Sequence, residues 1–470
     1  MAISSVTSGR KRFMDNIVPR AGGIRRDRNR SDNQILVNKF TFFLYLYFLV
    51  DFFLHLSARI PVYATLRPTL LLVLILTALL LFQREKFKGW TKDPVMQAML
   101  VFVGYLVLSL PFVEWQGSVI RNNLSEFVKA IVFLFFTALI VDNENRLKLF
   151  LFIFVGAQLF RVLEPLYLHI TTGYWGSSTY IGDGEFSNRL SGAPSDVINS
   201  NELGFVIVTV IPFLHYLVWP GRAWAKIFYV AVIPAMLYAL ILTQSRGAFL
   251  ALLVVAWMIF KSSKHKLMLI VLAFVIAVAG WSVMSSQQKD RYLSLVGMSQ
   301  VGGGNAGSAA GRISGMMNEF GLAMGRPIVG HGLGTTPEAK THILGSPQAA
   351  HNFYAELLVE TGILGFVLFM SFIVKVYRKL NENGKLLVNV ARGGELSFYR
   401  RLNQAMITVF WMYVVYSTNY WGLSQYYWYL FAGLCIVFSN RLVERLQSSE
   451  SEHTLSSRTK MRFGPNRARA

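Results

Sequence analysis

Charged residues are scarce in this chain. Only 15% of its 470 residues are Asp, Glu, Lys or Arg, whereas 53% are hydrophobic and 14% are aromatic. Soluble domains carry roughly 25% charged residues, so the composition excludes an assembly of ordinary soluble domains and a large catalytic domain outside the membrane. It has room instead for about 10 to 12 membrane-spanning helices of roughly 20 residues each.

Cysteine and acidic residues are also few. The single cysteine, Cys435, lies in an apolar run, which excludes an internal disulfide framework and a cysteine-based zinc site. The 25 acidic residues stand against 46 Lys and Arg, which gives a formal charge of +21. Most of these basic residues occupy the two tails and the loops between apolar segments. We therefore expect contact with membrane lipids and no nucleic-acid partner.

Twelve apolar segments satisfy the usual hydropathy criterion. They predict an all-α polytopic membrane protein with about 12 transmembrane helices. The basic loops alternate with the segments so that both termini are expected in the cytoplasm. The segments cover roughly residues 40–56, 66–82, 94–112, 124–141, 148–170, 201–219, 227–243, 247–260, 267–284, 352–374, 402–419 and 421–438.

Five regions follow from this pattern. A basic cytoplasmic tail, 1–39, lacks the short apolar core of a cleavable signal peptide. The other regions are helices one to nine (40–284) with an outer loop at 171–200, a large outer loop (285–351), helices ten to twelve (352–438) and a basic cytoplasmic tail (439–470).

The large outer loop is longer than structureless loops usually are, which indicates a functional segment. Apolar residues at Ile313, Met316, Met317 and Phe320 predict an amphipathic helix. Ser308 is the expected N-cap and Gly325 the expected end of that helix.

Arginine residues on the outer side run against the topological bias and need another explanation. Arg246 lies in a tight hairpin between two apolar segments, and Arg312 is expected in the first turn of the loop helix, where anions are favoured. Guanidinium groups bind phosphate through two hydrogen bonds and stay charged when desolvated. Both are candidates for an anion site, as are Arg326 and Arg189. The alternative is a snorkelling or solvated arginine at each position.

A polar stripe begins where the large loop meets the tenth segment. His351 could transfer a proton near neutral pH, and the alternative is a histidine that caps the helix at the interface. Asn352, Glu356 and Glu360 follow at helical spacing, where ionisable groups normally face a polar cavity. The eight histidines show no metal-binding spacing, so we expect no metal.

Charged residues inside the predicted spans are expected to pair along their own helices. Lys129 lies three residues after Glu126, and Arg161 lies three residues before Glu164. This spacing brings two side chains together on one helix face. Asp51 in the first span has no obvious partner.

Three motifs occur in order between about residues 190 and 370. They are Leu242-Thr-Gln-Ser245-Arg246-Gly247-Ala-Phe-Leu, then Gly311-Arg312 with Gly325-Arg326-Pro327-Ile-Val-Gly330-His331-Gly332-Leu-Gly334, then His351-Asn352-Phe-Tyr-Ala-Glu356 with Glu360-Thr-Gly362-Ile-Leu-Gly365. Together with the spans and the large outer loop, they resemble the O-antigen ligase superfamily, which includes polymerase-like proteins and O-glycosylation ligases. Asn199, just before the sixth span, is similar to an Asn-containing segment of that family.

The resemblance implies a glycosyltransferase at the periplasmic face of a bacterial inner membrane. Its donor would be a glycan on undecaprenyl pyrophosphate, and its acceptor a glycan, a lipid or a protein. Arg246 and Arg312 would bind the pyrophosphate, and His351 would orient or deprotonate the acceptor hydroxyl. The remaining substrate-binding candidates are Arg189, Arg326, Asn199, Asn352 and Glu356. Fixed arginines stabilise the leaving group without a metal or other cofactor, and direct displacement would invert the anomeric centre.

Three functions stay open at this point. A ligase would move a finished glycan to an acceptor, and a polymerase would join one lipid-linked repeat unit to another. A flippase or transporter would often show paired repeats or interrupted helices in matching halves. The sequence shows no such repeat, which favours the two transferases.

Reporter fusions test the predicted membrane topology. Reporter fusions after Ser245 and His351 should report the periplasm, because both lie at predicted outer ends, whereas a fusion after Lys264 should report the cytoplasm. Cytoplasmic signals at Ser245 and His351 would contradict the arrangement.

Overall fold

The structure is a computed structural model. It describes residues 37–83, 85, 89–182, 185–293, 304–345, 352–389, 396–420 and 422–462, without the side chains of 179–182, 185, 287, 290, 291, 304–313 and 449–462. These residues belong to one compact unit that begins at Val37.

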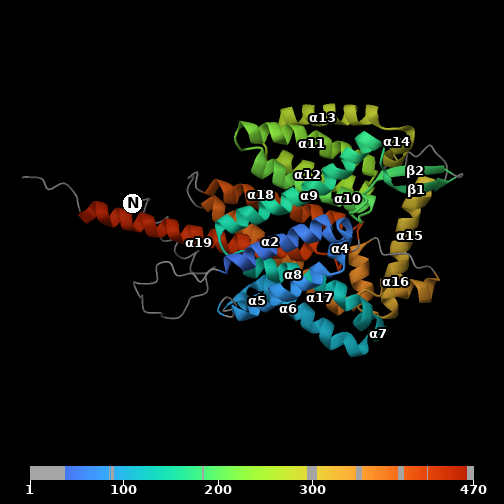
Figure 1. The fold of residues 1–470 in the computed structure, drawn as a ribbon, viewed down its shortest axis with the longest axis horizontal. Coiled ribbons are helices and arrows are strands. Elements are labelled where there is room, and N and C mark those ends of the chain that lie inside the picture. Colours follow the sequence, from blue (N-terminus) through green and yellow to red (C-terminus); the bar gives the residue numbers. More distant parts are fainter. Residues whose placement is uncertain are drawn as a thin grey trace, which may run out of the picture. The chain divides into compact units, whose positions relative to one another are not determined.

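In this described part of the chain, twelve helices correspond to the twelve predicted spans (Figure 1). They are α2 (Lys39–Leu54), α5 (Pro68–Phe82), α6 (Pro94–Ser109), α8 (Leu124–Ile140), α9 (Glu144–Thr172), α10 (Ser200–Phe213), α11 (Ala223–Thr243), α12 (Arg246–Ser262), α13 (Lys266–Val283), α17 (Phe353–Asn389), α18 (Ser397–Tyr416) and α19 (Tyr427–Arg462). Seven spans in the described residues are long and apolar enough to cross a membrane unaided. The predicted all-α polytopic class is confirmed.

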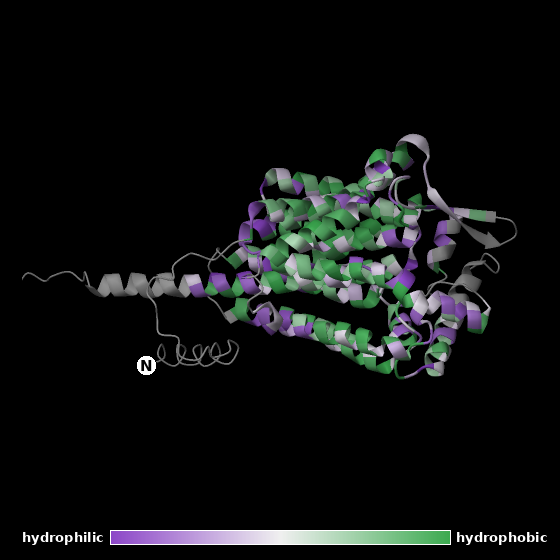
Figure 2. Cartoon of the chain, turned by 60° about the horizontal axis from the view of Figure 1, so that its bottom comes forward, coloured by the Kyte–Doolittle hydropathy of each residue, from purple (hydrophilic) through white to green (hydrophobic). Residues whose placement is uncertain are grey.

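The hydropathy of the helices fits a membrane environment. Figure 2 shows hydrophobic residues along the middle of the bundle and hydrophilic residues towards its ends. α13 exposes large apolar side chains, among them Leu267 at 75% and Phe274 at 69%. Water-soluble proteins rarely expose a continuous apolar surface of this kind, so these side chains face lipid.

Shorter elements complete the chain. The helical ones are α3 (Leu56–Arg59), α4 (Pro61–Ala64), η2 (Trp90–Lys92), η3 (Leu110–Phe112), α7 (Gln116–Ser118), η4 (Val119–Asn123), η5 (Leu214–Val218), α14 (Ser286–Leu293), α15 (Gly304–Gly325), α16 (Thr336–Ala339) and η7 (Lys340–Leu344). An antiparallel hairpin of β1 (Gly176–Gly182) and β2 (Glu185–Leu190) lies at the same end of the bundle as α15 and α16 (Figure 1).

Two features of the outer segments differ from expectation. The hairpin occupies a segment predicted as a loop, although Asp183-Gly184 between two alternating stretches is a hairpin signal in the sequence. The loop helix begins at Gly304 and not after Ser308, so Arg312 lies in its third turn. A serine often caps a helix, but the alanines at 306, 309 and 310 favour its interior. The predicted end at Gly325 is confirmed.

Loops predicted on the cytoplasmic side gather at the end of the bundle opposite the hairpin. Asp142 accepts a hydrogen bond from Val37 N at 2.6 Å and pairs with Arg146 at 2.9 Å. Tyr399 Oη donates to Glu144 Oε2 at 2.8 Å, which joins α18 to the start of α9. The alternation of the predicted loops is therefore present in the fold, while the compartment that each end faces stays a prediction.

α17 is interrupted, whereas the sequence predicted a continuous helix. Gly362 has φ 63° and ψ −173°, a conformation that is essentially restricted to glycine. The interruption exposes backbone groups, which the segment 326–334 satisfies: His331 N donates to Val359 O at 2.8 Å and Gly332 N donates to Glu360 O at 3.0 Å. Backbone polar groups at membrane depth need such partners. This contact explains why the second and third motifs contain glycines: a side chain at Gly362 would not fit between the two segments.

Substitution of Gly362 tests the packing of the segment 326–334 against the break in α17. A Cβ atom there would lie 2.3 Å from Ile328 O, so Gly362→Ala should lower the free energy of unfolding by about 3 kcal/mol or more. The matched control is Gly104→Ala, where a Cβ atom would meet nothing within 4 Å. Denaturation of the purified protein in detergent measures the free energy of unfolding of both variants. Equal stability of the two would contradict the close contact between Gly362 and Ile328.

Candidate active site

The first turns of α10, α12 and α17 are fixed by capping residues. Asn199 caps α10 and forms a capping box with Glu202, and Ser245 Oγ caps α12 by accepting from Ala248 N at 3.3 Å. Asn352 Oδ1 accepts from Tyr354 N at 2.9 Å at the start of α17. Each cap defines where a helix begins and leaves its remaining N–H groups pointing outwards.

These three helix starts meet around the segment 416–426, which joins α18 to α19. Tyr416 Oη donates to Asn201 O of α10 at 2.6 Å, and Phe353 N of α17 donates to Ser417 O at 2.9 Å. α12 approaches so closely that a Cβ atom on Gly247 would lie 3.0 Å from Asn419 Cβ. Segments far apart in the sequence are thereby brought to one place.

The electrostatic consequence follows from helix geometry. A helix N-terminus carries a partial positive charge and N–H donors, which together favour anions. Here three such termini are anchored to one connecting segment: those of α10 (14 residues), α12 (17 residues) and the part of α17 that precedes its break at Gly362.

Two of the predicted arginines lie at this place. Arg246 is the first residue of α12 and is only 5% exposed. Arg189 on β2 is 8% exposed; its Nε donates to Thr243 O and its Nη2 donates to Asn201 Oδ1, both at 2.9 Å. Arg189 thus ties the hairpin to the turn that carries Arg246 and to α10.

The turn before Arg246 is held to the hairpin by hydrogen bonds. Gln244 has a left-handed backbone, with φ 50°, and accepts from Ser187 Oγ at 2.9 Å. Its side-chain amide also donates to Asn188 O at 2.8 Å. These bonds explain why the Gln-Ser-Arg-Gly sequence forms a tight, buried turn rather than an exposed loop.

Other predicted site residues lie elsewhere or outside the description. His351 lies outside the described residues, and the structure describes the backbone of Arg312 in α15 but not its side chain. Arg326 is half exposed; its Nη1 donates to Phe112 O at 3.3 Å and its Nε lies 3.7 Å from Glu114.

The polar stripe on α17 binds backbone groups. Glu356 Oε2 accepts from Gly422 N at 2.6 Å, and Asn352 Nδ2 lies 3.2 Å from Met316 Sδ of α15. Glu360 accepts from Gly334 N at 2.8 Å and from Thr336 Oγ1 at 2.9 Å. These contacts hold α15, the segment 326–334 and the 416–426 segment around the start of α17.

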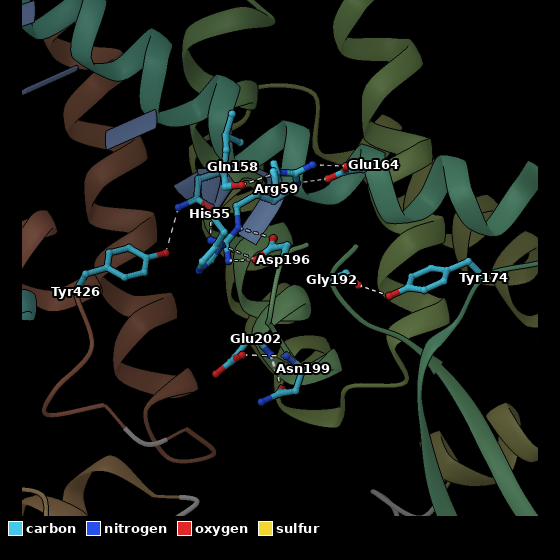
Figure 3. Close-up of polar contacts among 12 residues, drawn as sticks. His55, Arg59, Gln158, Glu164, Tyr174, Gly192, Asp196, Asn199, Glu202 and Tyr426 are labelled. Atoms are coloured by element: carbon cyan, nitrogen blue, oxygen red, sulfur yellow. Dashed lines mark hydrogen bonds and ion pairs between the residues drawn. The ribbon is translucent and has the colours of Figure 1, made fainter. Parts of the chain in front are cut away.

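A charged network beside the hairpin was not anticipated as a unit (Figure 3). Arg161 does not pair with Glu164 as expected; it forms two hydrogen bonds with Asp196, at 2.8 and 3.0 Å. Glu164 pairs with Arg59 instead, and His55 Nδ1 lies 2.9 Å from Asp196 Oδ1. The expected pair of Lys129 with Glu126 is confirmed, at 2.6 Å.

Partners distant in sequence explain the difference. Helical spacing identifies neighbours on one helix, but Asp196 comes from the loop after the hairpin, which spacing does not place. Burial raises the pKa of Asp196, but the contacts with His55 and Arg161 outweigh it and hold the pKa of the carboxyl below its ordinary value. Asp51, which lacked an obvious partner, accepts from Thr69 Oγ1 at 3.0 Å.

The fold is that of a multi-pass membrane protein, and its described part holds the buried Arg189 and Arg246 at one end of the bundle. Residues 229–370 match the family model described as O-antigen ligase. This segment is therefore similar to the O-antigen ligase family, as the motifs indicate. The matched segment runs from α11 into α17 and covers less than a third of the chain. Comparison with curated proteins gave no match.

The contribution of the Arg161–Asp196 pair to stability can be tested by substitution. The two side chains are 4% and 0% exposed, so Asp196→Asn should cost about 3 kcal/mol because it leaves a buried guanidinium without its counter-charge. The matched control, Glu126→Gln, breaks a pair that is 46% and 59% exposed and should cost less than about 1 kcal/mol.

The pH dependence follows from the lowered pKa. The stabilisation by Asp196 should be complete above the ordinary aspartate pKa of about 3.9 and disappear as the pH falls through the lower folded-state value. Melting temperatures in detergent at neutral and acid pH measure this. If Asp196→Asn melted like the wild type at pH 7, the network would not stabilise the fold.

Proposed function

We propose that this protein is a glycosyltransferase of the O-antigen ligase type. It transfers a glycan from undecaprenyl pyrophosphate to an acceptor hydroxyl at the periplasmic face of a bacterial inner membrane, with both termini in the cytoplasm. The observation that supports this most strongly is the meeting of three helix N-termini with the buried Arg189 and Arg246. The family match supports the ligase or polymerase type of activity.

The chemistry needs a site that stabilises negative charge. When the acceptor oxygen attacks the sugar C1 atom, the bond from C1 to the pyrophosphate oxygen breaks and its electron pair leaves with the pyrophosphate. Guanidinium groups and helix N-termini that are already in place stabilise that charge without reorganisation. Arg246 and Arg189 supply this function in the proposal, Arg312 assists from α15, and attack from the opposite face inverts the anomeric centre.

The remaining candidates take positioning roles. His351, next to the capped start of α17, orients the acceptor hydroxyl or takes its proton. Asn352 and Glu356 hold that helix start in place through their contacts with backbone groups. Asn199 fixes the start of α10, and Arg326 holds the segment 326–334 against the residues that follow α6. No step requires a metal or another cofactor.

Substitution of Arg246 tests the proposal directly. Arg246→Lys keeps the charge but loses the two-pronged geometry, so transfer should fall by a factor of about 100 or more while membrane insertion stays normal. The control is Arg441→Lys, because Arg441 pairs with Glu444 near the opposite end of the bundle. Surface glycan and protein abundance in membranes are the readouts. Full transfer in Arg246→Lys would remove the assignment.

The lipid-linked glycans that accumulate without the protein distinguish ligase from polymerase. Long undecaprenyl-linked polymer is expected for a ligase, because polymerisation then precedes the missing step. Single repeat units would indicate the polymerase, and units trapped in the cytoplasmic leaflet would indicate a flippase and contradict the proposal. Mass spectrometry of extracted lipids measures all three.

A further inference from the structure

A cavity of about 760 Å³ lies beside the hairpin, within the size range of small-ligand sites. Its walls come from five parts of the chain: the end of α2, α9, the residues around 174–177, the loop 191–199 with the start of α10, and Tyr420 with residues 425–427. The first turn of α10 contacts both this cavity and Arg189, since Glu202 lines the cavity while Asn201 Oδ1 accepts a hydrogen bond from Arg189. None of the three motifs between residues 242 and 365 contributes to its lining, but Asn199, a predicted substrate-binding residue, does.

The charges in its wall are largely neutralised. Arg161 balances Asp196 through two hydrogen bonds. Glu202 accepts from Asn199 N at 2.9 Å, and its other oxygen has a long contact of 3.4 Å with Tyr420 Oη. That oxygen retains capacity to accept a hydrogen bond from a ligand. A wall of this kind favours a neutral ligand with hydroxyl groups over a phosphate.

His55 presents part of its ring to the cavity. Its Nδ1 lies 2.9 Å from Asp196 Oδ1, while 35% of its side chain is exposed. A histidine ring can donate or accept a hydrogen bond, so this ring adds a polar group to the wall. Figure 3 shows His55 and Asp196 adjacent, with Asn199 and Glu202 nearby.

Aromatic rings complete the wall. Phe52, Phe205, Tyr420 and Tyr427 line the cavity together with its polar groups. The electron-rich face of such a ring complements the apolar C–H face of a sugar, while carboxylate, imidazole and amide groups bind its hydroxyls.

We propose that this cavity is a sugar-binding subsite, separate from Arg189 and Arg246, that holds one neutral sugar of the glycan. Glu202 accepts hydrogen bonds from its hydroxyls, His55 provides a further polar contact, and the aromatic rings contact its C–H face. The identity of the glycan rests on the proposed function; the binding of a sugar in this cavity does not. The shared wall of α10 explains how the subsite can hold the glycan next to the transfer site.

Binding to the purified full-length protein in detergent tests the subsite. The probe is a set of oligosaccharides made by partial acid hydrolysis of the surface polysaccharide of cells that produce the protein, titrated by saturation-transfer NMR. Val197→Trp should fill the cavity and weaken binding at least tenfold, because Val197 lines it and is 82% exposed. Glu202→Gln should weaken binding similarly while it keeps the helix cap.

Two controls separate this proposal from the proposed function. Val62→Trp, at a residue 81% exposed and outside the cavity, should bind like the wild type. Arg246→Lys should lose transfer and keep binding. If the wild type bound no oligosaccharide, if Val197→Trp and Glu202→Gln bound normally, or if Arg246→Lys lost binding, the subsite would be wrong. Normal transfer by Arg246→Lys with intact binding would refute the proposed function alone.

Kinetics identify the source of the sugar. If the subsite holds the donor glycan, Val197→Trp should raise the KM for the lipid-linked glycan. If it holds the acceptor, the KM for the acceptor should rise instead. An unchanged KM for both substrates would overturn the role in transfer.

Discussion

The arrangement depends on three helix starts that are held against one connecting segment. The hydrogen bonds from Tyr416 to Asn201 O and from Phe353 N to Ser417 O join α10, α17 and α18, and the absence of a side chain at Gly247 lets α12 approach Asn419. The partial positive charges of the helix ends and the buried arginines then act at one place. Guanidinium groups and helix N-termini fixed in this way can stabilise an anion without reorganisation.

Glycines have a comparable role on the other side of α17. The break at Gly362 is possible because the segment 326–334 donates hydrogen bonds to the carbonyl groups that the break exposes. The same segment binds Glu360 through Gly334 N and so fixes the helix that begins at Asn352. The glycine-rich segment 326–334 therefore stabilises the start of α17 through backbone hydrogen bonds.

The sequence predicted much of the fold because membrane insertion leaves a strong pattern. The twelve apolar segments correspond to twelve helices of the described structure. Local signals in the sequence also predicted the turn at Arg246 and the end of α15 at Gly325. Spacing could not reveal that Arg161 binds Asp196, since that pair depends on how a loop folds back over α9. The break in α17 was also missed, because hydropathy is insensitive to one glycine. Nor did any of the three motifs include the cavity beside the hairpin, whose walls come from five separate segments.

In the proposed mechanism, Arg246 and the surrounding helix ends bind a diphosphate. Phosphorus NMR of undecaprenyl diphosphate in detergent, titrated with the purified protein, measures this binding. The wild type should shift or broaden the diphosphate signals, Arg246→Gln should abolish the effect, and Arg441→Gln should preserve it. Identical titrations for the wild type and Arg246→Gln would show that Arg246 does not bind the diphosphate.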